Sequence, residues 1–416
     1  MPSRNSRRKS PPRARVPARP ATSPPSPQKS PDPAALKRHF QLIEGNKSRR
    51  RRRILVTVCV IVVVLVVLAA VNAGTPGGLV ERAQNTFAGM GGGGGYPVAI
   101  PSGSFVDAQL SGNTLNLVTS NAAAGFSQSG RQLFNRTPEM DNPALAANNF
   151  RTLLYDRGGS SLWVQNNTGV LYQRTFTGRI VTAALGEDGA YAVVVDSSDH
   201  ASQVYVFDRN NRQLDAWQPA NVNIGAVAVA AGGDNFAAVG VSEKDGAIVS
   251  TVYVMNAQKS DPVAQEPYAG SMIYTLDYKA DGRIFGVADN LCLSLSGKGT
   301  DARTYSYDGM SLCGISRADE NDTALLLQNT GGTGGQRVAV LSGEAGLAGQ
   351  FDVTEQASGV ALSGGNVFLQ FTGSVARYNL SGKQTKSWNV DGNVLRIVAD
   401  ASDVFAVSFS QVQLLS

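Results

Sequence analysis

Few side chains of this sequence could carry out acid–base or metal chemistry. The chain of 416 residues contains two histidines, and His39 lies in a basic N-terminal tail, which leaves His200 for a folded domain. A catalytic triad or a histidine-based metal site would have to use this residue. His200 lies in the polar segment Asp196–Ser202 between two predicted strands, where we expect a solvated loop residue. The sequence therefore predicts no catalytic residue, no metal site, no cofactor and no enzyme.

Carboxylates are the next candidates for chemistry. Five aspartates precede a glycine and could bind calcium at the turns of a β fold, namely Asp188, Asp245, Asp281, Asp308 and Asp391. None has the spacing D-x-D-x-D-G, and Asp-Gly is a preferred pair in tight hairpins, so we interpret them as turns. Asp107 and Asp277 could instead meet in the central channel of a ring-shaped fold and serve a hydrolase or lyase.

The chain has three cysteines, and two of them could form a disulfide. Cys59 lies in an apolar run, whereas Cys292 and Cys313 lie in the later, folded part. An oxidising exterior would permit a bond between Cys292 and Cys313. The alternative is a pair of buried thiols that act as small hydrophobic side chains.

A hairpin signature that occurs three times indicates the fold that must position these groups. Segments 126–132, 207–213 and 378–384 each begin with an aromatic residue and end in glutamine after an arginine or lysine. Their first positions lie 81 and 171 residues apart, close to two and four units of about 40 residues, the length of a propeller blade. From residue 96 onward, short apolar runs alternate with Gly, Asn and Asp turns, which is typical of an all-β domain.

The repeat predicts an eight-bladed β-propeller over residues 96–416. The third strand of each blade should end near Phe126, Val164, Phe207, Met255, Leu295, Leu341, Tyr378 and Leu414. The last unit lacks a fourth strand, and we expect Tyr96–Pro101 to supply it and close the ring. Seven blades are the alternative, because the second unit has a weak inner strand near residues 142–149. Trp217 and Trp388 each follow the repeated glutamine by four residues, which predicts packing between repeats.

An apolar run upstream predicts a membrane anchor. Residues 54–73 carry no charge, and 20 residues at about 1.5 Å each match the hydrocarbon thickness. Five arginines precede the run and place the N-terminus in the cytoplasm and the propeller outside: Arg49, Arg50, Arg51, Arg52 and Arg53. A cleaved signal peptide is the alternative, since Val71 and Ala73 fit small-residue cleavage positions.

The remaining segments complete the domain organisation. Residues 1–53 hold 16 Lys or Arg against Asp32 and Glu44, whereas the rest of the chain is acidic. The basic charge therefore serves membrane topology and not nucleic-acid binding. Within this tail, residues 33–44 predict a short amphipathic helix. Residues 74–95 end in a glycine run and predict a flexible linker that lets the propeller reorient.

Two sequence patterns resemble known families. Segments 186–194 and 279–287 are similar to the strand–Asp-Gly–strand hairpins of WD40-like and quinoprotein-like propellers. The layout over about residues 45–416 resembles a family of uncharacterised membrane-anchored propeller proteins of Gram-positive bacteria, a domain of unknown function. The resemblance implies a cell-surface protein and transfers no catalytic residue.

Three functional hypotheses follow. The first is a single-pass membrane protein whose extracytoplasmic propeller is a scaffold that binds envelope proteins or glycans, with the lipid bilayer and an envelope molecule as partners. The second is a propeller hydrolase or lyase that uses channel carboxylates. The third is a transmembrane sensor with the basic tail as its output.

Overall fold

The computed structural model describes residues 52–67, 69, 78–198, 200–219, 221–317, 321–330, 335–401 and 403–416. Residues 52–67 are helical. Within the described ranges, no helix has both the length and the apolar character that crossing a membrane requires. Residues 68 and 70–73 of the predicted span over 54–73 lie outside the described ranges. The tail with its predicted short helix and Arg49, Arg50 and Arg51 also lies outside them. The membrane span and the short helix therefore stay predictions. Residues 69–416 form a separate compact unit.

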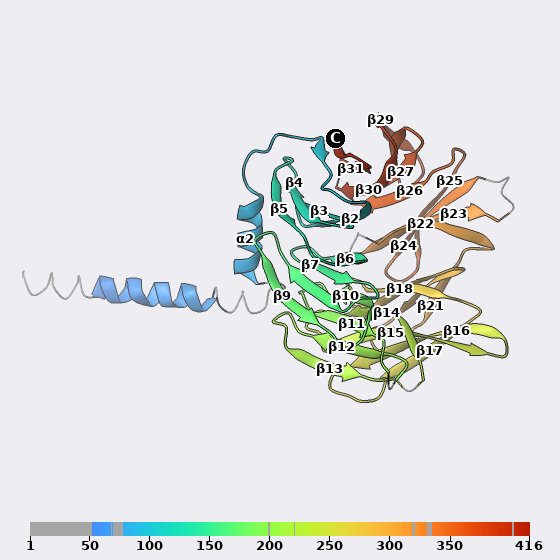
Figure 1. The fold of residues 1–416 in the computed structure, drawn as a ribbon, viewed down its shortest axis with the longest axis horizontal. Coiled ribbons are helices and arrows are strands. Elements are labelled where there is room, and N and C mark those ends of the chain that lie inside the picture. The colour runs from blue at the N-terminus through green and yellow to red at the C-terminus, as the bar shows by residue number, and fades with distance from the viewer. Residues whose placement is uncertain are drawn as a thin grey trace, which may run out of the picture. The chain divides into compact units, whose positions relative to one another are not determined.

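This unit contains eight four-stranded antiparallel sheets, the blades of a propeller, which Figure 1 shows arranged around a central axis. Blade one consists of β2 (Phe105–Ser111), β3 (Thr114–Thr119), β4 (Ala123–Ser127) and β5 (Gln132–Arg136), and blade two of β6 (Pro143–Ala147), β7 (Thr152–Asp156), β8 (Ser161–Gln165) and β9 (Val170–Thr175). Blade three consists of β10 (Ile180–Leu185), β11 (Tyr191–Val195), β12 (Gln203–Phe207) and β13 (Gln213–Trp217). Blade four consists of β14 (Asn223–Val229), β15 (Asn235–Lys244), β16 (Ala247–Asn256) and β17 (Ala264–Ala269).

Blade five consists of β18 (Ile273–Tyr278), β19 (Ile284–Ala288), β20 (Leu291–Leu295) and β21 (Arg303–Ser306). Blade six consists of β22 (Met310–Ser316), β23 (Asp322–Asn329), β24 (Gln336–Ser342) and β25 (Leu347–Val353). Blade seven consists of β26 (Gly359–Ser363), β27 (Asn366–Phe371), β28 (Ser374–Asn379) and β29 (Gln384–Asn389). The eighth combines β30 (Val394–Asp400), β31 (Asp403–Ser408) and β32 (Gln411–Leu415) with β1 (Val98–Ala99). The prediction of eight blades is confirmed. The seven-bladed alternative is wrong, because β6 forms the inner strand of the second blade, for which the sequence signal is weak.

The two ends of the propeller sequence meet in the eighth blade. Strand β1 pairs antiparallel with β32, with Val98 opposite Val412. Strand β2 of the first blade also contacts β30 of the last. The segment before the first inner strand therefore supplies the missing outer strand, as predicted, and no sheet edge is left open at the junction.

The repeated hairpin signature has the same geometry in its three blades. Its aromatic residue and its glutamine pair across the turn between the third and fourth strands, as in Phe126 with Gln132 and Phe207 with Gln213, and the register shifts at that pair. Trp217 on the outer strand β13 packs against Phe236 and Tyr253 of the next blade. The signature therefore contributes to the pairing and packing of the blades.

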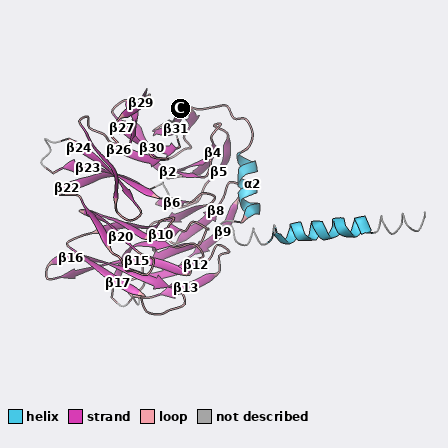
Figure 2. Ribbon diagram, turned by 180° about the vertical axis from the view of Figure 1, so that it is seen from behind, coloured by secondary structure: helices cyan, strands magenta, loops and turns pink. Residues whose placement is uncertain are grey.

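Successive strands alternate in direction, so the loops lie on two faces. We call top the face that carries the loops before each first strand and those between second and third strands. The bottom face carries the other two sets. The first strands surround the central channel. Figure 2 shows the strands of the propeller and, within the same compact unit, helix α2 (Leu79–Gly89).

Candidate functional site

The innermost strands of six blades carry a β-bulge close to their top end. The register shifts there in β2, β10, β14, β18, β22 and β30. A bulge leaves one residue unpaired and changes the direction of its side chain, and bulges are common next to functional sites. The unpaired residues are Val106, Val181, Gly225, Tyr274, Cys313 and Leu395.

We call these six residues the mouth ring, because their strands surround the top opening of the channel. Leu395 is half-buried and the other five are exposed, with Tyr274 at 50%. Four of the six are aliphatic or aromatic, although the side chains of a folded domain are usually buried when apolar. A group of exposed apolar side chains on one opening indicates an interaction surface.

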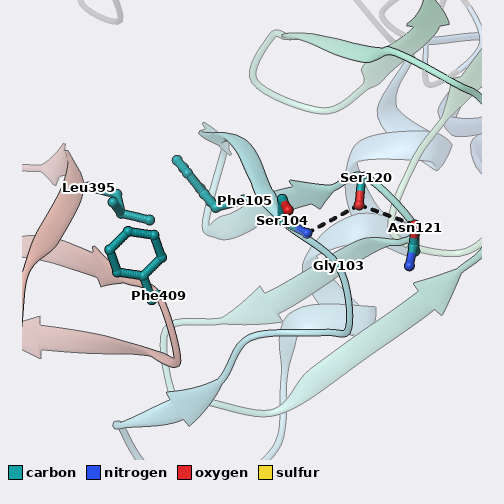
Figure 3. A pocket seen from close by; sticks show the side chains of 7 residues that line it. All are labelled: Gly103, Ser104, Phe105, Ser120, Asn121, Leu395 and Phe409. Atoms are coloured by element: carbon teal, nitrogen blue, oxygen red, sulfur yellow. Dashed lines mark hydrogen bonds between the residues drawn. The ribbon is translucent and has the colours of Figure 1, made fainter.

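A pocket adjoins the mouth ring between the eighth and first blades. It has a volume of about 600 Å³, which falls in the range of small-molecule pockets. In Figure 3, Leu395 and Phe409 form one wall, Phe105 lies between the walls, and Ser104, Ser120 and Asn121 form the other. Phe409 is 72% exposed in the loop between β31 and β32. The pocket therefore offers an apolar wall that faces a polar one.

The polar wall is held by its own hydrogen bonds. The backbone amide of Ser120 donates to the carbonyl of Ser104 at 2.8 Å, and the amide of Ser104 donates to Oγ of Ser120 at 3.1 Å. Gly103 has a φ of 111°, and a Cβ there would lie 2.8 Å from Oγ of Ser120. Glycine is therefore required at this rim, because a side chain would be strained and would displace the serine.

The two carboxylates proposed for a channel enzyme do not converge. Asp107 lies in the first blade just after the bulge at the top, whereas Asp277 lies in the fifth blade next to the bottom end of β18. Blades one and five face each other across a ring of eight. Each carboxylate is paired with an arginine of a neighbouring blade, Asp107 with Arg396 at 3.0 Å and Asp277 with Arg317 at 2.8 Å. They act as inter-blade ion pairs.

The two propeller cysteines are free thiols, so the structure does not contain the Cys292–Cys313 disulfide that the sequence permits. Cys292 is buried in β20, where its sulfur lies 3.3 Å from the hydroxyl of Tyr307. Burial raises the pKa of Cys292 to about 12. Cys313 is exposed in the mouth ring, so a buried thiol describes Cys292 and not Cys313.

The other predicted groups lie in turns and loops. His200 is exposed between β11 and β12, and its backbone amide donates to Oγ of Ser197 at 3.3 Å. Asp245 and Asp308 have φ values of 54° and precede a glycine of positive φ, as expected for Asp-Gly turns. In the part of the chain that the structure describes, no group of three His, Cys, Asp or Glu side chains could hold a metal ion.

A second site, which the sequence does not predict, lies on the bottom face. Helix α2 docks there through Glu81, which accepts two hydrogen bonds from Arg151 in the loop between β6 and β7, at 2.8 and 2.7 Å. The two side chains are 15% and 6% exposed. Arg151 also donates to the carbonyl of Arg209 in the third blade at 2.6 Å. Because the carboxylate and the guanidinium are bidentate and largely buried, the contact is directional.

Asn85 completes this contact one helical turn later. Its side-chain amide donates to the carbonyl of Phe150 at 2.7 Å, and its oxygen accepts from the backbone amide of Asn167 at 3.2 Å. Beyond the helix, Arg131 donates to the carbonyls of Met90, at 2.7 Å, and Ala88. These bonds connect α2 to blades one and two. We call α2 and these partners the clamp.

The glycine run after α2 also lies against the propeller. The amide of Gly95 donates to the carbonyl of Ser129 at 3.1 Å, and Oγ of Ser129 donates to the carbonyl of Gly91 at 3.1 Å. A Cβ at Gly93 would lie 2.2 Å from the carbonyl oxygen of Ser129. Glycine is thus required for close approach of two backbones. The prediction of a flexible linker over 74–95 is therefore wrong for residues 79–95.

Comparison with solved structures shows the same fold in proteins of low identity. The C-terminal WD40 domain of Sif2 gives a TM-score of 0.56 at 12% identity and covers 78% of this chain and 99% of that chain. Sqt1 of Saccharomyces cerevisiae gives 0.52 at 11%, covering 77% and 98%. Apo AztD from Citrobacter koseri gives 0.50 at 12%, covering 71% and 88%. At these identities, the likeness concerns the fold.

Comparison of sequences adds a family. No curated protein matches the sequence. Residues 103–414, which include β2 to β31 and all but the last residue of β32, match the model of a family of unknown function. The resemblance to a propeller family without assigned activity is thereby confirmed, and the chain belongs to DUF5711, a family of unknown function.

Proposed function

We propose that this DUF5711 chain is a non-enzymatic binding module, anchored by a span over 54–73, whose propeller binds an envelope protein or glycan outside a Gram-positive cell. The observation that carries the proposal is the mouth ring with its adjoining pocket, where apolar side chains are exposed on one face. The free energy of the system falls when a partner covers such a surface, because apolar area is removed from water.

A catalytic role receives less support. Asp107 and Asp277 lie in opposite blades at opposite ends of the channel, and each is engaged by an arginine. Paired acid and base carboxylates in hydrolases lie roughly 5–10 Å apart on either side of the bond that is broken. We therefore favour binding over hydrolysis or elimination.

Cys313 offers a direct test of the topology. In intact cells that express a Cys59→Ser variant, a membrane-impermeant maleimide should label the full-length chain, because Cys313 is exposed and Cys292 is buried. The matched control, Cys59→Ser with Cys313→Ser, should remain unlabelled. Labelling that appears only after cell lysis would contradict an extracytoplasmic propeller.

A photo-crosslinking amino acid tests the binding face. Placed at Phe409 on the top face, it should form adducts of discrete mass in living cells. Placed at Lys298, which is exposed in a bottom loop between β20 and β21, it should form far fewer. Equal adducts at both positions, or none at either, would contradict the proposal.

The clamp supports the sensor hypothesis as a second candidate. Because α2 is tied to blades one and two by side-chain hydrogen bonds, a change in the propeller could be transmitted to the segment that precedes it. Deletion of residues 1–45 should then abolish a propeller-dependent phenotype. An unchanged phenotype would contradict this role and leave the binding role intact.

A further inference from the structure

We infer that the top face binds a cationic protein segment and takes one of its apolar side chains into the pocket between the eighth and first blades. The inference rests on the proposed binding function and names the chemistry of its partner. Three observations carry it: the lining of the pocket, the charge of the top loops, and the partial occupation of the opposite face by α2.

The pocket has room for an apolar side chain of a partner. Leu395 and Phe409 supply apolar surface on one side, Phe105 lies between the walls, and Ser104, Ser120 and Asn121 supply polar groups on the other. An aromatic or aliphatic side chain inserted there would cover Phe409, which is 72% exposed. Anchor side chains that fill a pocket commonly dominate the energy of a protein interface.

The charge of the top loops selects the partner. Among the described residues, the acidic side chains of these loops are Glu139, Asp141, Asp196, Asp245, Asp289, Asp308, Glu355 and Asp391. The basic ones are Arg157 and Arg179. Arg179 is already paired with Asp196 at 2.9 Å. A face with this excess of carboxylates attracts cationic partners and repels anionic ones, including anionic envelope polymers.

Other occupants fit less well. A second copy of the propeller would bring two acidic top faces together, which costs free energy through like-charge repulsion. The basic tail of the same chain would complement the charge, but it precedes the proposed span and would lie on the other side of the membrane. The bottom face is partly occupied by α2. A separate cationic protein segment is therefore the occupant that the observations favour.

Peptide selection tests the inference. A random peptide library displayed on phage is selected against the detergent-solubilised full-length chain, and the best peptide is synthesised and titrated. Selected peptides should carry net positive charge and an aromatic or aliphatic residue. Phe409→Ser should weaken binding roughly tenfold to hundredfold, the loss expected when one apolar side chain no longer packs. Replacing the apolar residue of the peptide by serine should have a similar effect.

Phe87→Ser is the matched control. Phe87 lies on α2 and is 69% exposed, close to the 72% of Phe409, but it is remote from the top loops in sequence and in the fold. This variant should leave the affinity unchanged. A charge variant, Glu355→Gln with Asp391→Gln, should weaken binding, and added salt should weaken it further.

Three results would overturn the inference: selected peptides that are acidic or neutral, equal effects of Phe409→Ser and Phe87→Ser, or no enriched peptide. A purified anionic glycan that competes for the same face would also overturn it. Crosslinks in cells at Phe409 but not at Lys298 would, in each of these cases, preserve the proposed binding function. Failure of the inference is thus distinguishable from failure of that function.

Discussion

The candidate sites on the two faces of this propeller differ in how far their side chains are exposed to solvent. On the bottom, the carboxylate of Glu81 and the guanidinium of Arg151 lie 2.7 Å apart and are 15% and 6% exposed. On the top, Phe409 is 72% and Tyr274 50% exposed. The Glu81–Arg151 ion pair is thus covered within the chain, while Phe409 and Tyr274 are open to solvent. The comparison indicates that the clamp is a contact completed within the chain, whereas the pocket on the top face is open to a partner.

The largest expected difference concerns two phenylalanines four residues apart in the eighth blade. Phe405 is 1% exposed and contacts Tyr96 with ring centroids 5.4 Å apart. Phe405→Ala should lower the free energy of unfolding by about 3–5 kcal/mol, because it leaves a cavity in the core. Phe409→Ala should change it by less than about 0.5 kcal/mol. Guanidinium unfolding of both variants measures the difference, and similar losses would show that Phe409 belongs to the core.

The clamp should have the next largest effect. Arg151→Met leaves the Glu81 carboxylate largely buried without its partner, which should cost about 3 kcal/mol. It should also raise amide hydrogen exchange in α2. Arg157→Met is the control, because Arg157 is an exposed arginine on the top face. Thermal unfolding and exchange of both variants test this, and equal behaviour would mean that α2 is not held by Arg151.

A pair of glycines sharpens the comparison further. A Cβ at Gly189 would lie 2.8 Å from a guanidinium nitrogen of Arg151, whereas a Cβ at Gly158 would meet nothing within 4 Å. Both have positive φ, 94° and 84°, so either alanine variant pays a backbone cost of roughly 1–2 kcal/mol. Gly189→Ala should cost about 1 kcal/mol more and release α2. Hydrogen exchange that rises equally in α2 for both variants would contradict a steric effect on the clamp.

Cys313 and Cys292 should differ in their reactivity, and testing this difference does not change the stability of the protein. In a Cys59→Ser background at about pH 8, Cys313 in the mouth ring should react with iodoacetamide in the native protein. Cys292 should not react, since burial raises its pKa to about 12 and the thiolate is the reactive form. Mass spectrometry of the alkylated peptides measures both sites. Native labelling of Cys292 would mean that the blade around it opens.

Local signals made the blades predictable. Phe207 and Gln213 face each other across one turn, so their pairing depends on residues that are neighbours in sequence. The same holds for the Asp-Gly turns. Closure by the segment before the first strand was also predictable, because a unit that lacks its fourth strand leaves an edge that must be paired. These features follow from short-range backbone geometry and from the number of strands in each repeat.

The candidate sites were less predictable. Composition suggested that residues 74–95 are a tether, but segment 79–88 contains no glycine, a signal that could have indicated the helix. The glycines that follow allow close approach to Ser129 and do not provide flexibility. The bulges of the mouth ring had no such signal, because Val106 and Tyr274 occupy strands in which an apolar residue is expected in either register.

The sequence by itself determined that this chain repeats a four-stranded unit eight times and closes on itself, because strand, turn and repeat signals act over a few residues. The tertiary structure decided which residues face one another across the ring. Glu81 and Arg151 are 70 positions apart, and Phe105 and Phe409 line one pocket from opposite ends of the propeller sequence. Contacts at such separations depend on how many blades intervene and at which angle they pack, and no local pattern encodes them.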